Sequence, residues 1–414
     1  MKQLIRSCLF LFALLFFFTS NAQFENAKWY FGGFVCLDFM TNPPTVLNNG
    51  ALSTMEGCST ISDATGNLLF YSDGIKVWNK QHALMINGTG LNGGSSTTQS
   101  ALIVKKPGSS SLYYVFTMGV SYPNYGGPLN YSIVDMTQAG GMGSVITKNV
   151  FMDSICTEKL AAARHCNGVD AWIIMHSNHS NSFKAFLLSS SGLNINPVVS
   201  SVGTVHNSGA TGYLKVSPNG QKLGLAVNQS GFELYDFDKA TGIVSNPLML
   251  GGQPQSPYGC EFSPDGSKFY GANGLEQNNP IHQWNLCAGS NQAIVASHTL
   301  VGNVSGVSEI GSFQLGLDGK IYVSRYGAST IGIINNPNAY GTGCNFVNLA
   351  MSLAPNTCYY AFQNCINDLG GPAPGVCYAY DCNSPTFIAS HARESSLTAL
   401  YPNPMNSHVY LETS

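Results

Sequence analysis

The stretch that decides the fold runs from Pro257 to Asn273 and reads PYGCEFSPDGSKFYGAN. It encodes two short strands joined by a tight turn. Pro264 presets φ for the first turn position, Asp265 tolerates the next, and Gly266 takes the positive φ that ends the turn. The aromatic residues that follow alternate as in a strand. Related copies begin at Tyr213 (YLKVSPNGQKLGLAVN) and at Phe313 (FQLGLDGKIYVSR).

These hairpins belong to a longer repeat. The turn glycines lie on average roughly 50 residues apart, which is the period of a four-stranded propeller blade. The sequence therefore predicts an all-β protein, a β-propeller of seven four-stranded blades. Six copies account for Glu56 to Asn348, and strands before Asn42 pair with Cys358 to Ile366 to close the ring, because a closed ring has no exposed sheet edge. A β-sandwich or a two-domain all-β protein is the alternative. The turn glycines are Gly66, Gly108, Gly168, Gly220, Gly266 and Gly319.

The composition supports many short strands. The 414 residues include 45 Gly, 20 Tyr and 22 Phe, and only 9% of them are charged, which is unfavourable for long helices with charged faces. Ser154 to Arg164 is the one helix-like stretch, and we expect it to lead into a repeat; IVASHTL from Ile294 is predicted to be a strand. The net charge of −3 and the lack of a basic cluster argue against nucleic-acid binding.

The first 22 residues have the pattern of a secretory signal peptide. Lys2 and Arg6 precede an apolar run from Leu9 to Phe18, and small polar residues follow up to Ala22. The run is about half the ~20 residues that span a bilayer. We therefore expect cleavage after residue 22, export, and no transmembrane segment in the mature chain.

Twelve cysteines include Cys8 in the leader, so the mature chain would carry an odd number. Export permits disulfides, and Cys358 with Cys365, or Cys377 with Cys382, could close small loops, although spacing does not give the connectivity. No Cys/His cluster has zinc spacing. We predict structural sulfur, no metal and no cofactor.

The character of the chain changes after residue 368. Residues 24–368 form the predicted propeller, 369–395 a Gly/Pro-containing polar linker, and 396–414 a separate tail. The tail LTALYPNPMNSHVYLETS offers one alternating strand, and a lone strand cannot bury a core.

This tail, from Ala399 onward, resembles the start of the C-terminal sorting domain of the Bacteroidota type IX secretion system. The later glycine- and lysine-bearing motifs of that domain are absent. The body, with GALSTMEGCSTISDATGNLLFYSDGIKVWN and SALIVKKPGSSSLYYVFT, resembles secreted propeller-like proteins of the same bacteria, and its SPDGSKFY-type repeats are similar to those of lactonase-type and YVTN-type propellers. The resemblance implies a blade skeleton, secretion or an outer-membrane surface location, and the type IX machinery as a partner.

A propeller most often binds ligands at the mouth of its central channel, beside the first strand of each blade. The residues five before the clear turn glycines are Lys215, Glu261 and Gln314, with Ala163 in a less regular copy. The candidate ligand-binding residues are Lys215, Glu261, Gln314 and His165. The structural alternative, in which such residues only solvate a water-filled channel, is favoured because fold alone implies no activity.

Other residue types give weaker signals. His165, His176, His179 and His206 could form a metal or acid/base group, but surface histidines explain them better. Glycosidase chemistry needs two carboxylates across the bond, and no pattern brings two together. The sialidase Asp-box, the GxSxG elbow and phosphate-binding loops are not met. The candidate acids are Glu56, Asp63, Glu158, Glu261 and Glu309.

The sequence thus predicts a secreted or cell-surface binding module for a glycan or a protein, with no assigned catalytic residue. One alternative is a hydrolase or lactonase-type enzyme with acids at the channel mouth. Another is a structural adhesin or gliding-associated component.

Overall fold

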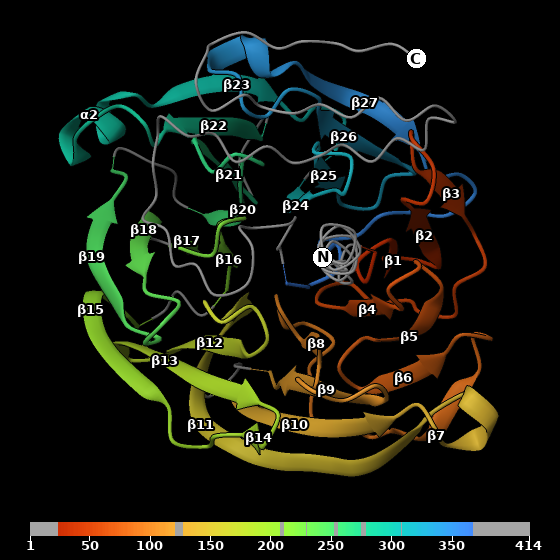
Figure 1. Cartoon of the computed structure of the whole chain (residues 1–414). Helices are drawn as coiled ribbons and strands as arrows, with labels where there is room; N and C mark the ends of the chain where they lie inside the picture. The colour runs from red at the N-terminus through yellow and green to blue at the C-terminus, as the bar shows by residue number, and fades with distance from the viewer. Residues whose placement is uncertain are drawn as a thin grey trace, which may run out of the picture.

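The computed structural model describes residues 24–120, 127–207, 211–228, 230–251, 256–274, 279–307 and 309–366. Short antiparallel sheets stand around a common centre, with one strand of each sheet inside and one at the rim (Figure 1). The predicted signal peptide (1–22), the linker (369–395) and the tail (396–414) lie outside the described residues.

Three sheets have four strands each in sequence order, and they contain the three clearest repeats. Gly220, Gly266 and Gly319 have φ values of 74°, 70° and 75°, so the predicted hairpin turns are confirmed. The sheets are β16 (Leu214–Val216), β17 (Lys222–Val227), β18 (Gly231–Phe237) and β19 (Val244–Met249); β20 (Pro257–Phe262), β21 (Lys268–Asn273), β22 (Pro280–Asn285) and β23 (Thr299–Asn303); and β24 (Ile310–Leu315), β25 (Ile321–Arg325), β26 (Thr330–Ile334) and β27 (Phe346–Ser352).

The turn between β20 and β21 is held by its own residues. The amide of Gly266 donates to the carbonyl of Ser263 at 2.9 Å. The carboxylate of Asp265 accepts from the Ser263 hydroxyl at 2.7 Å and from the Ser267 amide at 2.9 Å. These residues therefore have a structural role in the turn.

The strands between residues 59 and 206 form one 12-stranded sheet, because β11 is shared. The first part of β11 pairs with β10, its last part pairs with β12, and Ser144 also meets Ile86 of β7 in parallel. Since such a sheet can be divided in more than one way, the number of seven blades stays a prediction. Its strands are β4 (Ser59–Ser62), β5 (Leu68–Ser72), β6 (Lys76–Asn79), β7 (Leu84–Thr89), β8 (Ala101–Lys105), β9 (Leu112–Met118), β10 (Gly127–Asp135), β11 (Ser144–Arg164), β12 (Ala171–Ser177), β13 (Ser180–Ser189), β14 (Gly192–Leu193) and β15 (Val198–His206).

The N- and C-terminal parts of the described chain close the ring, as predicted. Gly33, after β1, forms an antiparallel bridge with Thr357, and Cys58 forms a parallel bridge with Gln363. On the other side, the amide of Ser312 in β24 donates to the carbonyl of Tyr360 at 2.6 Å. The N-terminal sheet contains β1 (Lys28–Phe31), β2 (Val35–Asp38) and β3 (Thr45–Leu47).

Two local predictions have different outcomes. Ser154–Arg164 is strand, the last part of β11, as expected. The strand predicted from Ile294 is wrong: α2 (Asn291–Ala296) is helical there, because the Ser290 side chain caps it by accepting from the Ala293 amide, and β23 begins at Thr299. Two short 3-10 turns complete the secondary structure, η1 (Ala139–Gly141) and η2 (Gly341–Cys344).

The disulfide between Cys358 and Cys365 that the spacing allowed does not form. Neither residue is in a disulfide, nor are six other described cysteines, whereas Cys287 is disulfide-bonded. The thiols of Cys358 and Cys365 occupy different environments, one in the apolar core and the other beside Gln314. Among the described residues, no group of His, Cys, Asp and Glu is arranged to hold a metal, and no helix is long and apolar enough to cross a membrane.

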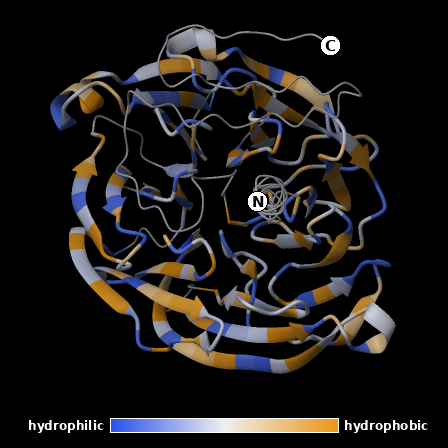
Figure 2. Ribbon diagram, viewed as in Figure 1, coloured by the Kyte–Doolittle hydropathy of each residue, from blue (hydrophilic) through white to orange (hydrophobic). Residues whose placement is uncertain are grey.

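The core is a series of apolar layers between neighbouring sheets. One layer joins β11 to β13 with β16 to β18, and another joins β17 and β18 with β20 to β22. The outer strands mix hydrophobic and hydrophilic residues along their length (Figure 2). Face-to-face packing of this kind brings the first strands of all sheets together around the axis.

Candidate functional site

The centre of the ring is occupied by the chain itself. Asn364 donates from its side chain to the carbonyl of Leu160 at 2.8 Å and accepts, at its backbone oxygen, from the Ser59 hydroxyl at 2.7 Å. The Gln99 amide also approaches the Asn364 side-chain oxygen at 3.5 Å. Tyr213 is 2% exposed among these groups. The expected water-filled channel is therefore replaced by protein at this level, because the closing segment turns inward.

Three of the four predicted ligand-binding residues lie together in the wall of this channel. The Lys215 ammonium is 3.1 Å from Glu261 Oε2 and donates to Gln314 Oε1 at 2.6 Å. Glu261 also accepts from the amides of Phe262 at 2.9 Å and Leu315 at 3.2 Å. The set, called here the channel trio (Lys215, Glu261, Gln314), is at most 5% exposed. Its charges are balanced inside the protein, which favours a structural role, although not the solvation of a water-filled channel.

His165 lies elsewhere, in the turn between β11 and β12. Its Nδ1 accepts from the Asn167 amide at 3.1 Å, its Nε2 is 3.2 Å from the Ala240 carbonyl, and its ring packs 5.8 Å from that of Trp172. Ala163, two residues earlier, is the position equivalent to the trio. The strand has ended before His165, so its side chain serves the turn.

A second polar group stands where the innermost strands begin. The Tyr258 hydroxyl donates to Glu56 Oε1 at 2.8 Å. Glu158 Oε2 accepts from both the amide and the hydroxyl of Thr98, at 2.9 and 2.8 Å. The Thr98 hydroxyl in turn accepts from the Gly212 amide at 3.3 Å. Five segments that are distant in sequence thus meet at two carboxylates: Glu158 and Tyr258 lie in β11 and β20, and Glu56, Thr98 and Gly212 lie just ahead of strands.

The two carboxylates affect one another. Burial, and then the charge of Glu158, raise the pKa of Glu56 to about 7, although the Tyr258 hydroxyl lowers it. Glu56 is 9% exposed and Glu158 is 3% exposed. Near neutral pH the Glu56 carboxyl is therefore partly protonated, while the Glu158 carboxyl accepts hydrogen bonds from Thr98. The pair can donate and accept protons or bind hydroxyl groups.

Tyrosine rings continue from this pair. Tyr258 packs 5.7 Å from Tyr360, which stacks on Tyr326 at 4.2 Å and 25°. All three residues are partly exposed, so part of each side chain borders solvent. We call Glu56, Thr98, Glu158, Tyr258 and Tyr360 the mouth cluster.

The sequence analysis named both acids without pairing them and missed the tyrosines. A signal for the acids existed: Glu56, Thr98, Glu158 and Glu309 each stand ten residues before a turn glycine, just as the channel trio stands five before. Counting further up the same strands would have placed them at one end of the ring. Glu309 shares the position and is half-buried, which raises the pKa of its carboxyl. The tyrosines beside the two acids stand at no common distance from the turn glycines.

The histidines are not the surface residues that the sequence favoured. His176 and His206 are 0% and 1% exposed, and their rings stack with centroids 3.7 Å apart. Only His179, with φ of 54°, is exposed. The prediction of surface histidines is wrong for His176 and His206. Strands β12 and β15 place both rings at the contact with the next sheet.

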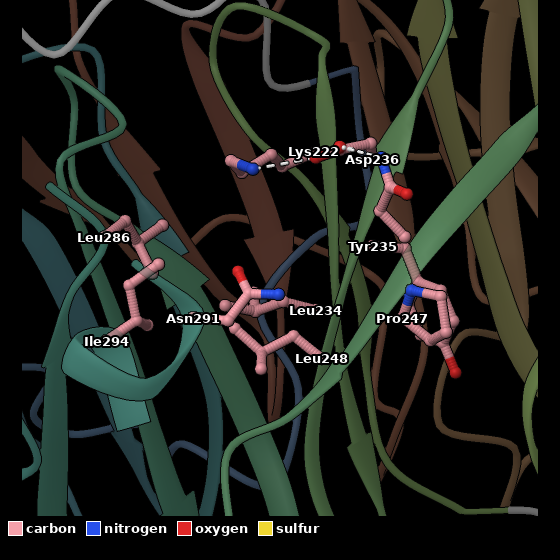
Figure 3. Close-up of a pocket in the computed structure, with 10 residues that line it drawn as sticks. Lys222, Leu234, Tyr235, Asp236, Pro247, Leu248, Leu286, Asn291 and Ile294 are labelled. Atoms are coloured by element: carbon pink, nitrogen blue, oxygen red, sulfur yellow. Dashed lines mark hydrogen bonds and ion pairs between the residues drawn. The ribbon is translucent and has the colours of Figure 1, made fainter. Parts of the chain in front are cut away.

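A separate groove lies on the outside, between β18, β19 and α2 (Figure 3). Its volume is about 420 Å³, within the range of small-ligand sites. The Asp236 carboxylate in its wall accepts from Lys222 and from Asn246, both at 2.8 Å, so its charge is compensated. The groove is lined by Lys222, Leu234, Tyr235, Asp236, Asn246, Pro247, Leu248, Leu286, Asn291 and Ile294.

Comparison with known proteins agrees with the topology. A 6-phosphogluconolactonase candidate from Bacteroides fragilis shares 12% identity, with 81% of this chain and 98% of that chain covered and a TM-score of 0.51. The fold is a β-propeller. A similar candidate from Bacteroides uniformis matches at 11% identity (79% and 98% covered, TM-score 0.48), and Kluyveromyces lactis Hsv2 at 10% (75% and 89%, TM-score 0.44). Such identities show the fold alone. No family model and no curated protein matches the chain.

Proposed function

We propose that this propeller is an extracellular or cell-surface binding module that holds a glycan at the mouth cluster. The observation that carries the proposal is the pair of carboxylates bridged through Tyr258 and Thr98, beside partly exposed tyrosines, at one end of the ring. In contrast to the channel trio, this group combines hydrogen-bonding capacity with a border to solvent.

The chemistry suits a ligand rich in hydroxyl groups. Carboxylate oxygens accept hydrogen bonds from hydroxyls, and charge-assisted bonds of this kind are about twice as strong as neutral ones. Tyrosine supplies an apolar face for a sugar ring together with a polar tip. A protein partner with Ser, Thr or Tyr side chains at its surface would offer the same hydroxyl donors. An experiment is therefore needed to distinguish a glycan ligand from a protein ligand.

The test is a glycan array probed with the exported chain, followed by calorimetry on any hit. Glu56→Gln keeps the shape of the side chain and Tyr258→Phe removes only the bridging hydroxyl. We expect each variant to weaken binding about 10-fold or more, since a lost hydrogen bond to a charged group is worth about 1.5–3 kcal/mol. Asn246→Ala in the groove is the matched control and leaves affinity unchanged.

A hit that is insensitive to the mouth variants but lost in the groove variant would refute the mouth as the binding site. Absence of binding across the array, together with capture of a defined surface protein that depends on Tyr258, would replace the glycan with a protein ligand.

A second function, a hydrolase of the lactonase type, is favoured by one observation. The pKa of Glu56 near 7 lets its carboxyl give up a proton near neutral pH, and Glu158, whose charge acts on Glu56, supplies a second carboxyl that already accepts hydrogen bonds. In ester hydrolysis Glu158 would take a proton from water as its oxygen bonds to the carbonyl carbon. The carbon–oxygen bond to the leaving alkoxide then breaks, and Glu56 gives that oxygen a proton.

Turnover of sugar lactones, followed by proton release in weak buffer, tests this activity. The expected result is a bell-shaped pH profile and a loss of 100-fold or more in kcat/KM for Glu56→Gln and for Glu158→Gln. Rates equal to those of buffer, or variants as active as the parent, would reject the hydrolase.

Export belongs to the same proposal. The leader-like residues 1–22 and the tail from Ala399 support secretion and sorting by a type IX apparatus. In a strain that lacks this apparatus, the full-length gene product should stay in the periplasm. Unimpaired release to the medium would contradict the sorting role of the tail.

A further inference from the structure

A buried polar cluster joins two parts of the ring away from the mouth. It contains His176 at the end of β12, His206 at the end of β15 and Glu233 in β18. His206 Nε2 is 3.2 Å from Glu233 Oε2, and the two imidazoles stack with their planes 21° apart. Phe183 packs edge-on against His176 at 4.6 Å. The cluster therefore sits between the β11–β15 strands and the β16–β19 sheet.

The Glu233 carboxylate of this cluster accepts several hydrogen bonds. Besides His206, Glu233 accepts from the Tyr235 hydroxyl at 2.6 Å and from the Thr204 hydroxyl. Burial raises the pKa of Glu233, but hydrogen bonds from His206, Thr204 and Tyr235 outweigh it, so the net shift is downward. Glu233 is thus an anion at neutral pH, and His206 satisfies it as a neutral donor.

The imidazoles, in contrast, are poorly supplied with partners. Within the described part of the chain, both ring nitrogens of His176 and Nδ1 of His206 lack a hydrogen-bond partner. Among the described residues no carboxylate acts on His176, whose titratable neighbours are His206 and Lys159. A proton added to His176 would find no carboxylate to stabilise it, whereas a proton on His206 would face Glu233 on one side and His176 and Lys159 on the other.

A buried cation, Lys159, interacts electrostatically with both Glu158 and Glu233. Lys159 of β11 is 0% exposed and donates to the Thr211 carbonyl at 2.7 Å. Burial lowers the pKa of Lys159 to about 8, although Glu158 and Glu233 raise it, so the amine is mostly protonated at pH 7. With neutral imidazoles, the cluster holds one positive and one negative charge. Protonation of the histidines would add like charges that face one another and Lys159.

We propose that His176, His206, Glu233 and Lys159 form an acid-sensitive joint, here called the histidine joint, which holds the β11–β15 strands to the β16–β19 sheet at neutral pH and loosens when the pH falls. The joint is independent of what the mouth cluster binds, so the failure of one proposal leaves the other intact.

The direction follows from proton linkage. Burial lowers the pKa of His176 well below its ordinary value and also lowers that of His206. When the joint opens, both rings regain an ordinary pKa of about 6.5 and take up protons. The closed form therefore loses stability as the pH falls through about 6.5. Glu56 acts in the opposite sense, because its pKa is raised, so whole-protein stability alone would mix the two effects.

Hydrogen exchange followed by mass spectrometry isolates the joint in the full chain. From pH 7.5 to 5.5, after correction for intrinsic exchange, two rings with an opened-state pKa of about 6.5 predict up to about 100-fold more opening at β12, β15 and β18. In His176→Phe a phenyl ring replaces the imidazole beside Phe183. Only His206 then takes up a proton on opening, and the expected increase falls to about 10-fold. The β24–β25 hairpin serves as internal reference.

The matched control is His282→Phe. His282 and His298 form another histidine pair, hydrogen-bonded at 2.9 Å between β22 and the second residue after α2, and burial lowers the pKa of His282 to about 4. This variant should leave exchange at the histidine joint unchanged. The same pH response in His176→Phe as in the parent would overturn the proposal. Should His176→Phe not fold, imidazole NMR of the parent decides: a ring of the stacked pair titrating near 6.5 in the folded protein overturns it.

Discussion

The channel trio and the mouth cluster both border the centre of the ring, and on β20 Tyr258 stands three residues before Glu261, yet the two groups compensate buried charge differently. In the channel trio, Lys215 neutralises Glu261 and Gln314 completes the hydrogen bonds. In the mouth cluster, Glu56 and Glu158 influence one another and are supplied by hydroxyls and an amide. A buried group that contains its own counter-charge is complete as scaffold. A pair of acids retains capacity for a proton or a ligand.

This contrast concerns stability as much as function. Removing one partner of a buried ion pair leaves an uncompensated charge, whereas replacing both partners can be nearly neutral. A carboxyl with a raised pKa costs little while it is protonated and more once it ionises. Each prediction below changes one side of the comparison.

The largest effect is expected for Lys215→Met. The variant leaves Glu261 as a fully buried anion, and the free energy of unfolding should fall by about 3–5 kcal/mol. Chemical denaturation at pH 7 measures it. The control is Lys222→Met, which breaks a pair with Asp236 that is partly exposed (23% and 43%) and should cost at most about 1 kcal/mol. Equal losses in the two variants would show that the channel trio has no special structural role.

Removing the second charge should restore part of that stability. In Lys215→Met with Glu261→Gln, no charge remains, and the Gln oxygen can still accept from the Leu315 amide. We expect the double variant to regain about 2 kcal/mol relative to Lys215→Met, since the orphaned charge is the main cost. A double variant less stable than Lys215→Met would mean that the hydrogen bonds of Glu261, not its charge, dominate.

Glu56→Gln tests the opposite side of the comparison. The folded pKa of Glu56 is about 7 against an ordinary 4.5, so its contribution is present below pH 4.5 and is lost as the pH rises through 7. Relative to the parent, the variant should therefore gain stability between pH 5 and 8, by on the order of 2 kcal/mol. Denaturation midpoints across this range measure the difference. A difference independent of pH would show that Glu56 ionises normally.

The sequence was sufficient for the propeller and for the channel trio because both follow from one local rule. A turn glycine every 50 or so residues fixes the hairpins, and counting back five residues finds equivalent strand positions. The shared strand β11 and the helix α2 lay outside that rule. β11 continues from one group of strands into the next, and the Ser290 cap outweighs the strand-like pattern after it.

The mouth cluster and the histidine joint could not be paired from sequence for a different reason. Tyr258 and Glu56 are 202 positions apart and meet across the ring, so their contact depends on closure of the whole circle. His176 and His206 belong to different strands of one sheet, and Glu233 to the next sheet. The position of a residue within a repeat predicts how far along the ring axis its side chain lies. Which side chains meet across the centre depends on the packing of complete sheets.

The smallest effect is expected at His165, the predicted site residue that the structure places in a turn. His165→Ala loses contact with Trp172 and one carbonyl, in a position partly open to solvent. The free energy of unfolding should change by about 0.5 kcal/mol, as for most surface substitutions, and ligand affinity at the mouth should not change. Denaturation and calorimetry on the same preparation measure both. If affinity fell 10-fold with stability intact, the ligand surface would have to extend from the mouth cluster to the β11–β12 turn. Charge balance would then have assigned His165 wrongly to the structural residues.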